Sequence, residues 1–100
     1  MKYLVYGAGG TGGCLAAFLA MGEKDVTLIA RGAHRDAIEK NGLVLETGHG
    51  TFAVPIPVFE QEIYDQQPDV IFVCVKGYSL EGTLPTLQRL CRPETIVIPI

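Results

Sequence analysis

The sequence contains few basic residues and no long apolar segment. Lys and Arg together number eight, they are scattered along the chain, and the net charge is −3. This balance argues against a nucleic-acid partner and against an anionic membrane surface, since both usually need clustered basic residues. The N-terminal apolar run is too short for a signal peptide, and no segment reaches transmembrane length. We therefore expect neither a nucleic acid nor a membrane as a partner.

Residues that bind metals or act as nucleophiles are scarce as well. Cys14, Cys74 and Cys91 show no Cys-x-x-Cys spacing, and His34 and His49 do not have the spacing of metal ligands. The Asp, Glu and Ser residues form no recognisable triad or carboxylate pair. An odd number of cysteines without a signal peptide favours reduced thiols. We expect a cytoplasmic protein without a metal site.

Apolar runs that alternate with helical segments make up most of the chain. With 48% hydrophobic residues, the 100 residues can form one core, so we expect a single domain over residues 1–100. Such alternation predicts an α/β fold, a doubly wound parallel sheet with right-handed crossovers. The expected strands are 2–6, 26–30, 70–75 and 95–100, and the expected helices are 10–21, 33–40 and 79–92.

The middle of the chain carries a different pattern. Two β-prone runs at 43–46 and 51–54 flank a Gly-containing loop and predict an inserted hairpin. Two prolines follow it and exclude a regular central strand there. The segment 59–67 is expected to form a short helix that packs Ile63 inward. In the helix at 79–92, which Pro85 either kinks or divides, the residues expected to share one face are Leu80, Leu84, Leu87 and Cys91.

A glycine motif joins the first expected strand to the first expected helix. It reads Gly7-Ala8-Gly9-Gly10-Thr11-Gly12, which matches Gly-x-Gly-x-x-Gly. In this motif Gly7 permits the tight turn, Gly9 lets a pyrophosphate approach the backbone, and Gly12 lets the helix pack closely on the strand. The helix would offer free amides and its positive dipole end to the phosphates. The alternative is a tight turn in a flavodoxin-like domain.

The end of the second strand indicates which dinucleotide binds. An Asp or Glu there would accept a hydrogen bond from the ribose 2′-hydroxyl of NAD, whereas an Arg accommodates a 2′-phosphate. The sequence has Ala30-Arg31 and no carboxylate on the preceding strand, which predicts NADP. Arg35, one helical turn further, either adds to the phosphate site or is solvated. The alternative for Arg31 is likewise a solvated side chain.

Lys76 follows the apolar strand at 70–75, where its charge would face a cleft or, alternatively, lie in water. The glycine motif, Arg31 and Lys76 thus follow the carboxyl ends of three different strands. In open α/β sheets the ligand binds beyond those ends. We therefore expect all three to lie along one edge of the sheet.

Four stretches together resemble the N-terminal domain of the ketopantoate reductase (2-dehydropantoate 2-reductase) family. The resemblance covers essentially the whole chain and rests on residues 7–12, 26–32, 41–46 and 73–78. It implies that Gly7, Ala8, Gly9, Gly10, Thr11 and Gly12 hold the pyrophosphate of NADPH. It also implies that Arg31 contacts the 2′-phosphate and that Lys76 lies near the nicotinamide end.

The resemblance further implies an activity that belongs to a longer protein. The family uses NADPH to reduce the ketone of ketopantoate, a 2-keto acid, to pantoate on the way to pantothenate and coenzyme A. Its members carry a second, helical domain that supplies the catalytic Lys. We therefore expect a truncated or excised domain that binds NADP(H), has no catalytic residue of its own, and exposes apolar surface that favours a homodimer or aggregation.

Two other functions remain open at this point. One is a nucleotide-sensing regulatory module without catalysis, although such modules more often carry an acidic residue where Arg31 stands. The other is a structural domain with an empty cleft. The parent enzyme could also act on a 2-keto acid other than ketopantoate.

Overall fold

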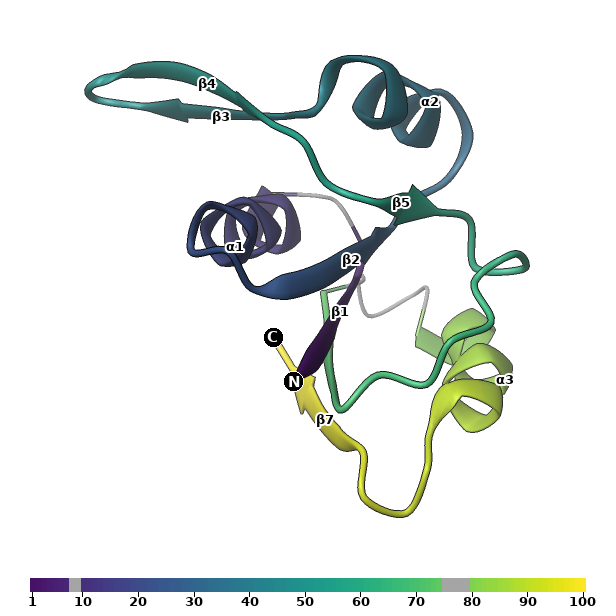
Figure 1. The fold of residues 1–100 in the computed structure, drawn as a ribbon. Coiled ribbons are helices and arrows are strands. Elements are labelled where there is room, and N and C mark those ends of the chain that lie inside the picture. The colour runs from purple at the N-terminus through teal and green to yellow at the C-terminus, as the bar shows by residue number, and fades with distance from the viewer. Residues whose placement is uncertain (8–9, 75–79) are drawn as a thin grey trace.

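A computed structural model describes residues 1–7, 10–74 and 80–100 of the chain. Strands and helices follow the predicted order except between the hairpin and residue 70 (Figure 1). They are β1 (Lys2–Tyr6), α1 (Gly10–Met21), β2 (Asp25–Ile29), α2 (Gly32–Asn41), β3 (Leu43–Thr47), β4 (Gly50–Val54), β5 (Val58–Phe59), β6 (Val70–Val73), α3 (Leu80–Leu90) and β7 (Ile96–Pro99).

In the described part of the chain, the central sheet has five strands in the order β5-β2-β1-β6-β7, all parallel. Its inner strands are apolar along most of their length because helices or connecting segments cover both faces. Leu4, Val5, Leu28 and Ile71 are completely buried. The prediction of a doubly wound parallel α/β domain is confirmed.

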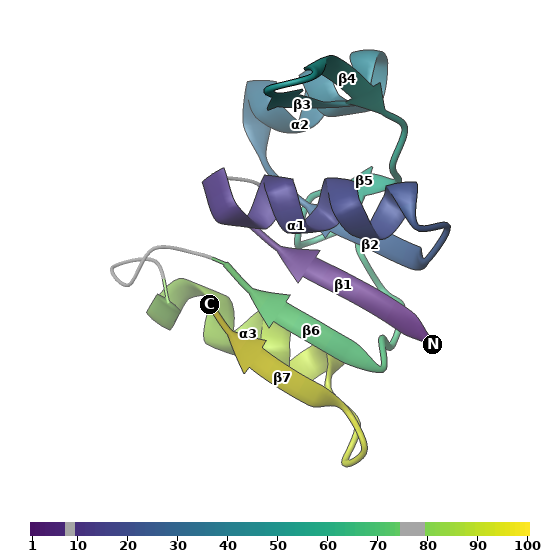
Figure 2. The ribbon, with the colours of Figure 1, turned by 90° about the vertical axis from the view of Figure 1, so that its left-hand side faces the viewer.

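Helices α1 and α3 lie on opposite faces of the sheet, as Figure 2 shows. The β3–β4 hairpin forms a separate antiparallel pair, as predicted, and packs on α1. Leu45 and Val54 of the hairpin belong to the same buried cluster as Ala16 and Ala17 of α1. Helix α1 is therefore apolar on two sides, one toward the sheet and one toward the hairpin.

The segment after the hairpin differs from the prediction. Residues 58–59 form β5, which pairs with β2 at the edge of the sheet, and residues 60–68 form a turn and irregular chain in place of a helix. Ile63 is 65% exposed, whereas Tyr64 is almost completely buried. The guanidinium of Arg89 donates to the carbonyl oxygens of Gln61 and Tyr64, both at 2.7 Å. These long-range hydrogen bonds use carbonyl groups that a helix would need for its own backbone. The predicted helix and the inward position of Ile63 are therefore wrong.

The predicted apolar face of helix α3 is wrong at Leu84; Cys91 packs against the buried cluster as predicted, and the side chain of Leu80 lies outside the described part of the chain. Leu84 is 48% exposed, while Thr83 and Leu90 are buried. Leu87 packs against the buried cluster, as predicted. Pro85 lies inside a single helix and does not divide it.

The C-terminus of α1 contains an unfavourable backbone conformation. The amide of Lys24 donates to Leu19 O and the amide of Glu23 donates to Ala20 O, which is the Schellman pattern. The residue with positive φ is Glu23 (φ 60°), not the preceding Gly22. A side chain at such a position is strained, and glycine relieves this strain.

We expect Glu23→Gly to stabilise the protein by about 0.5–1 kcal/mol, because it removes the left-handed strain at an exposed site. Urea denaturation of both proteins measures the change. Gly22→Ala is the control: Gly22 has an ordinary φ, so its replacement should not stabilise through this route. Equal or lower stability of Glu23→Gly would contradict the assignment.

Asp69 ties the amino ends of two strands together. Its Oδ2 accepts from the Lys2 amide at 2.7 Å, and its Oδ1 accepts from Arg92 Nη2 at 2.8 Å. Its backbone carbonyl accepts from the Ile96 amide at 2.9 Å. The Lys2 amide first, and then the Arg92 guanidinium, hold the pKa of Asp69 below its ordinary value of 3.8.

This lowered pKa predicts a pH-dependent contribution to stability. The contribution is complete above the unfolded-state pKa of 3.8 and is lost as the pH falls through the lower folded-state value. We expect Asp69→Asn to lower the melting temperature near neutral pH, and the gap to wild type to narrow in acid. Melting curves from neutral to acid pH measure this gap. Asp65→Asn, which removes an exposed carboxylate, is the control. A difference in melting temperature between Asp69→Asn and wild type that does not change with pH would refute the prediction.

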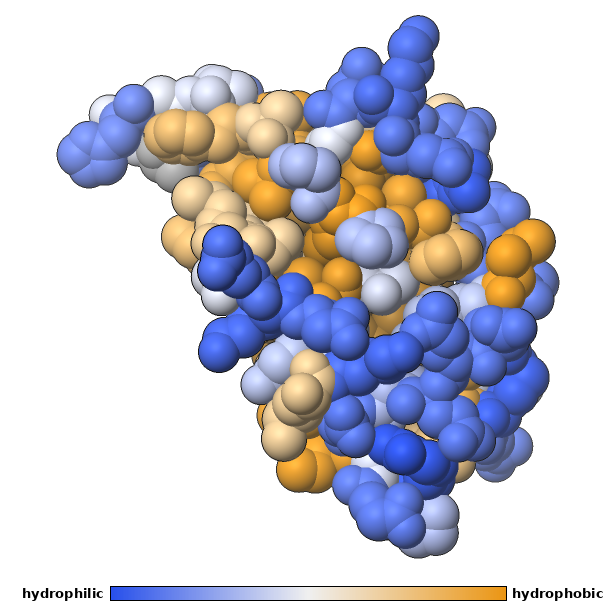
Figure 3. Space-filling view, in the orientation of Figure 1, coloured by the Kyte–Doolittle hydropathy of each residue, from blue (hydrophilic) through white to orange (hydrophobic). Residues whose placement is uncertain are grey.

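Apolar side chains remain exposed on α1 and on the edge strand β7. In the space-filling view, hydrophilic residues predominate at the upper right and lower right, while apolar surface lies in the centre, at the left over α1 and at the lower left over β7 (Figure 3). The exposed apolar residues of these two regions are Phe18, Met21, Ile96, Val97, Ile98 and Ile100.

Candidate functional site

Three parallel strands bring their carboxyl ends to one edge of the sheet. Tyr6 of β1 lies opposite Ile29 of β2 and Val73 of β6. The Gly7 amide donates to Ile29 O at 3.0 Å, and the Cys74 amide donates to Tyr6 O at 2.9 Å. For the described residues, the expected meeting of three strand ends is therefore confirmed.

The glycine motif begins and ends in described residues. Gly7 has a φ of 108°, which a residue with a side chain rarely adopts, and α1 begins at Gly10. A Cβ atom at Gly12 would lie 2.1 Å from Gly7 O and 2.8 Å from the Cβ of Cys74. No side chain fits at Gly12, which confirms its predicted part in close helix–strand packing. Ala8, Gly9 and the side chain of Thr11 lie outside the described part of the chain.

Arg31 occupies the turn between β2 and α2. It precedes the first residue of α2 with extended backbone (φ −138°, ψ 158°), and its side chain is exposed. Within residues 1–7, 10–74 and 80–100, its guanidinium makes no hydrogen bond or ion pair. This places a positive charge at the carboxyl edge of the sheet. Lys76, also predicted at this edge, lies outside the described residues, although β6 leads toward it.

Arg35 and the two histidines do not extend this site. The guanidinium of Arg35 forms ion pairs with Asp36 and Glu39 of its own helix, so it is engaged along α2. His34 faces a different cavity, and His49 lies in the turn of the hairpin. No cluster of three potential metal ligands occurs among the residues that the structure describes.

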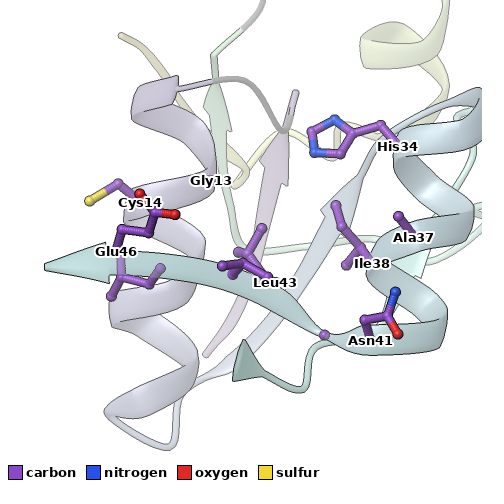
Figure 4. Close-up of a pocket in the computed structure, with 11 residues that line it drawn as sticks. Gly13, Cys14, His34, Ala37, Ile38, Asn41, Leu43 and Glu46 are labelled. Atoms are coloured by element: carbon purple, nitrogen blue, oxygen red, sulfur yellow. The ribbon is translucent and has the colours of Figure 1, made fainter. Parts of the chain in front are cut away.

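A cavity of about 450 Å³ opens between α1, α2 and β3. Figure 4 shows that α2 contributes one wall and β3 another. Its described lining includes no residue of β1 or β6, but Gly13 and Cys14 directly follow the glycine motif. The labelled residues are Gly13, Cys14, His34, Ala37, Ile38, Asn41, Leu43 and Glu46.

The cysteines behave as ordinary thiols in this fold. All three are free, and Cys14 is exposed. Burial raises the pKa of the Cys74 thiol, which disfavours the reactive thiolate.

No helix among the described residues is both long and apolar enough to span a bilayer.

The sequence reasoning missed Glu60, which follows β5 directly. Because β5 pairs with β2, this residue lies beside the turn that contains Arg31. Glu60 Oε1 accepts a hydrogen bond from the Gly32 amide at 3.3 Å, at the start of α2. The only local signal was the short apolar pair Val58-Phe59, which the neighbouring prolines obscured.

A parallel sheet covered on both faces, with a glycine turn between its first strand and first helix, defines a dinucleotide-binding domain of the Rossmann type. The family model described as ketopantoate reductase PanE/ApbA matches residues 3–100. The chain belongs to this family, whose members are oxidoreductases that bind nicotinamide cofactors.

Individual relatives agree with this membership. The chain is 37% identical to a 2-dehydropantoate 2-reductase of Mesorhizobium japonicum, over 98% of this chain and 30% of the relative. A putative 2-dehydropantoate 2-reductase from Enterococcus faecalis is 32% identical with a TM-score of 0.89, over 100% of this chain and 33% of that one.

A D-mandelate dehydrogenase, in a ternary structure with NADH and anilino(oxo)acetate, is 29% identical with a TM-score of 0.91. That match covers 100% of this chain and 33% of the dehydrogenase. The chain thus spans about a third of the length of the proteins it matches.

Proposed function

We propose that this chain is the NADP(H)-binding domain of a 2-dehydropantoate 2-reductase-like oxidoreductase. The observation that carries the proposal is the shared edge of β2, β1 and β6, where the glycine turn and Arg31 follow adjacent strands. The absence of room for a side chain at Gly12 supports it, because it keeps the start of α1 against the end of β1. Within the family, a protein with this domain would reduce ketopantoate or a related 2-keto acid.

The roles of the residues follow from their positions. The backbone from Gly7 to Gly12 would hold the pyrophosphate, with the amides at the start of α1 as donors. Arg31 would pair with the 2′-phosphate, since a guanidinium binds phosphate through two parallel hydrogen bonds. Lys76 would lie toward the nicotinamide. The bound cofactor would supply the hydride, and these residues would bind and orient it.

Turnover is a separate matter from cofactor binding. The family resemblance places the catalytic Lys in a second domain, and the chain spans about a third of its relatives. We therefore propose that these 100 residues bind NADPH but reduce no substrate by themselves. A 2-keto acid would be a substrate only of a protein that also carries the remaining two thirds.

Titration with NADPH, followed by nucleotide fluorescence or calorimetry, tests the cofactor site. Saturable binding at one site supports the proposal, and no binding would favour a structural domain with an empty cleft. NADPH oxidation with ketopantoate, assayed in a chain that includes the rest of its reading frame, tests the reaction. Binding without turnover in that longer protein would favour a nucleotide sensor.

We also propose that the chain associates with itself through its apolar surface. Strand β7 ends the sheet, and Ile96 and Ile98 lie on one face with Val97 on the other, all exposed. An edge strand of this kind promotes pairing with another copy. Sedimentation at increasing concentration should show a dimer or larger species, and a monomer throughout would contradict this.

A cytoplasmic location with reduced thiols remains a prediction.

A further inference from the structure

A further inference rests on the carboxylate of Glu60, which strand pairing places beside the end of β2. Strand β5 pairs with β2 so that Phe59 lies opposite Ile29, and the Ala30 amide donates to Phe59 O at 3.1 Å. Glu60, the next residue, is half-buried, and its Oε1 accepts from the Gly32 amide at 3.3 Å. Its carboxylate therefore lies at the start of α2, beside Gly32, which directly follows Arg31 in the chain.

This position is the one at which dinucleotide-binding domains discriminate between cofactors. An acidic side chain there accepts a hydrogen bond from the ribose 2′-hydroxyl of NAD and repels a 2′-phosphate. Strand β2 ends at Ile29, and neither Ile29 nor the following Ala30 provides a carboxylate at this end of the strand. The neighbouring strand provides it instead, through Glu60.

We infer that Glu60 is a specificity-determining residue that opposes Arg31 and lets the site accept NADH as well as NADPH. The inference rests on the proposed function. One carboxylate oxygen is held by the Gly32 amide, and the other can accept from the ribose hydroxyl. A 2′-phosphate would instead meet a like charge and compete for the Gly32 amide.

A purely structural role for Glu60 is the competing explanation. A carboxylate near the first amides of a helix stabilises that helix, whatever ligand binds. Loss of such a role would lower the melting temperature but would affect the two cofactors equally. The ratio of the NADPH and NADH dissociation constants therefore separates the two explanations.

The experiment measures that ratio for wild type, Glu60→Gln and Glu60→Ala. Glu94→Gln is the matched control, since it removes the same charge from an exposed turn before β7. Adenosine 2′,5′-bisphosphate and AMP, which differ only in the 2′-phosphate, repeat the comparison without the nicotinamide. The Ala variant, which also removes the side chain, provides a second test if the Gln variant fails to fold.

For both Glu60 variants we expect the ratio of dissociation constants to shift by about tenfold in favour of NADPH over NADH, and of adenosine 2′,5′-bisphosphate over AMP. The variants no longer repel the 2′-phosphate, and they lose the hydrogen bond to the ribose 2′-hydroxyl. The control should keep the wild-type ratio. A ratio in the Glu60 variants that is indistinguishable from wild type overturns the inference while the proposed function stands. If wild type binds none of the four nucleotides, the proposed function fails as well.

Discussion

Replacement of Gly12 by alanine should destabilise the protein by about 3 kcal/mol or more, because the new methyl group has no space. It would lie 2.1 Å from the carbonyl oxygen of Gly7, which is backbone and cannot rotate away. Helix α1 would have to move off β1, and the glycine turn would open. For a domain of this size such a loss lowers the melting temperature by roughly 12 °C or more.

The matched control for this change is Gly82→Ala in α3. Gly82 is exposed, and an added methyl there has nothing within 4 Å among the described residues. Alanine is the better helix former, so this variant should gain about 0.5–1 kcal/mol. Thermal and urea denaturation of the two variants should thus give shifts of opposite sign. A Gly12→Ala protein as stable as wild type would refute the close approach of α1 and β1.

Replacement of Arg31 by alanine should weaken NADPH binding by about tenfold or more while it changes NADH binding little, because hydrogen bonds to charged groups contribute about 1.5–3 kcal/mol. The side chain is exposed, so the fold should not suffer. Calorimetric titration with each cofactor measures the effect. The loss for NADPH should also shrink at high salt, since screening weakens exposed charge pairs.

Arg35→Ala provides the comparison for the Arg31 variant. It removes the same charge one helical turn further along α2, but from a guanidinium already paired with Asp36 and Glu39. A specific contact with the 2′-phosphate predicts a large effect at Arg31 and a small one at Arg35. Equal effects would indicate a general electrostatic field, and an unchanged preference in the Arg31 variant would remove Arg31 from the proposed role.

The elements that sequence predicted well are those whose pattern is local. Strand β1 and helix α1 match their predicted bounds, because an apolar run, a glycine turn and a helical repeat follow one another without interruption. The segment 60–68 could not be predicted in this way. Arg89 of α3 binds its carbonyl groups across the fold, and no pattern within the segment reveals that partner. Likewise, the sequence pattern did not show that Thr83 of α3 is buried while Leu84 is exposed.

In the candidate site, too, the residues set by a local pattern could be predicted and those set by long-range pairing could not. The glycine spacing and the Arg31 position can be read from consecutive residues. Glu60 could not, because it reaches Gly32 only through the pairing of β5 with β2, and a strand of two residues directly after Pro57 gives little signal. A cofactor preference predicted from the end of β2 alone therefore omits the charge of Glu60, which follows the neighbouring edge strand β5.

The two-sided packing of α1 has a consequence for engineering. A hairpin at the periphery is usually a convenient place for deletions or for grafting a new loop. Here Leu43, Leu45 and Val54 cover one side of α1. Trimming residues 43–54 would leave that side of the helix facing solvent, so a chimera that exchanges the hairpin must exchange the matching side of α1 with it.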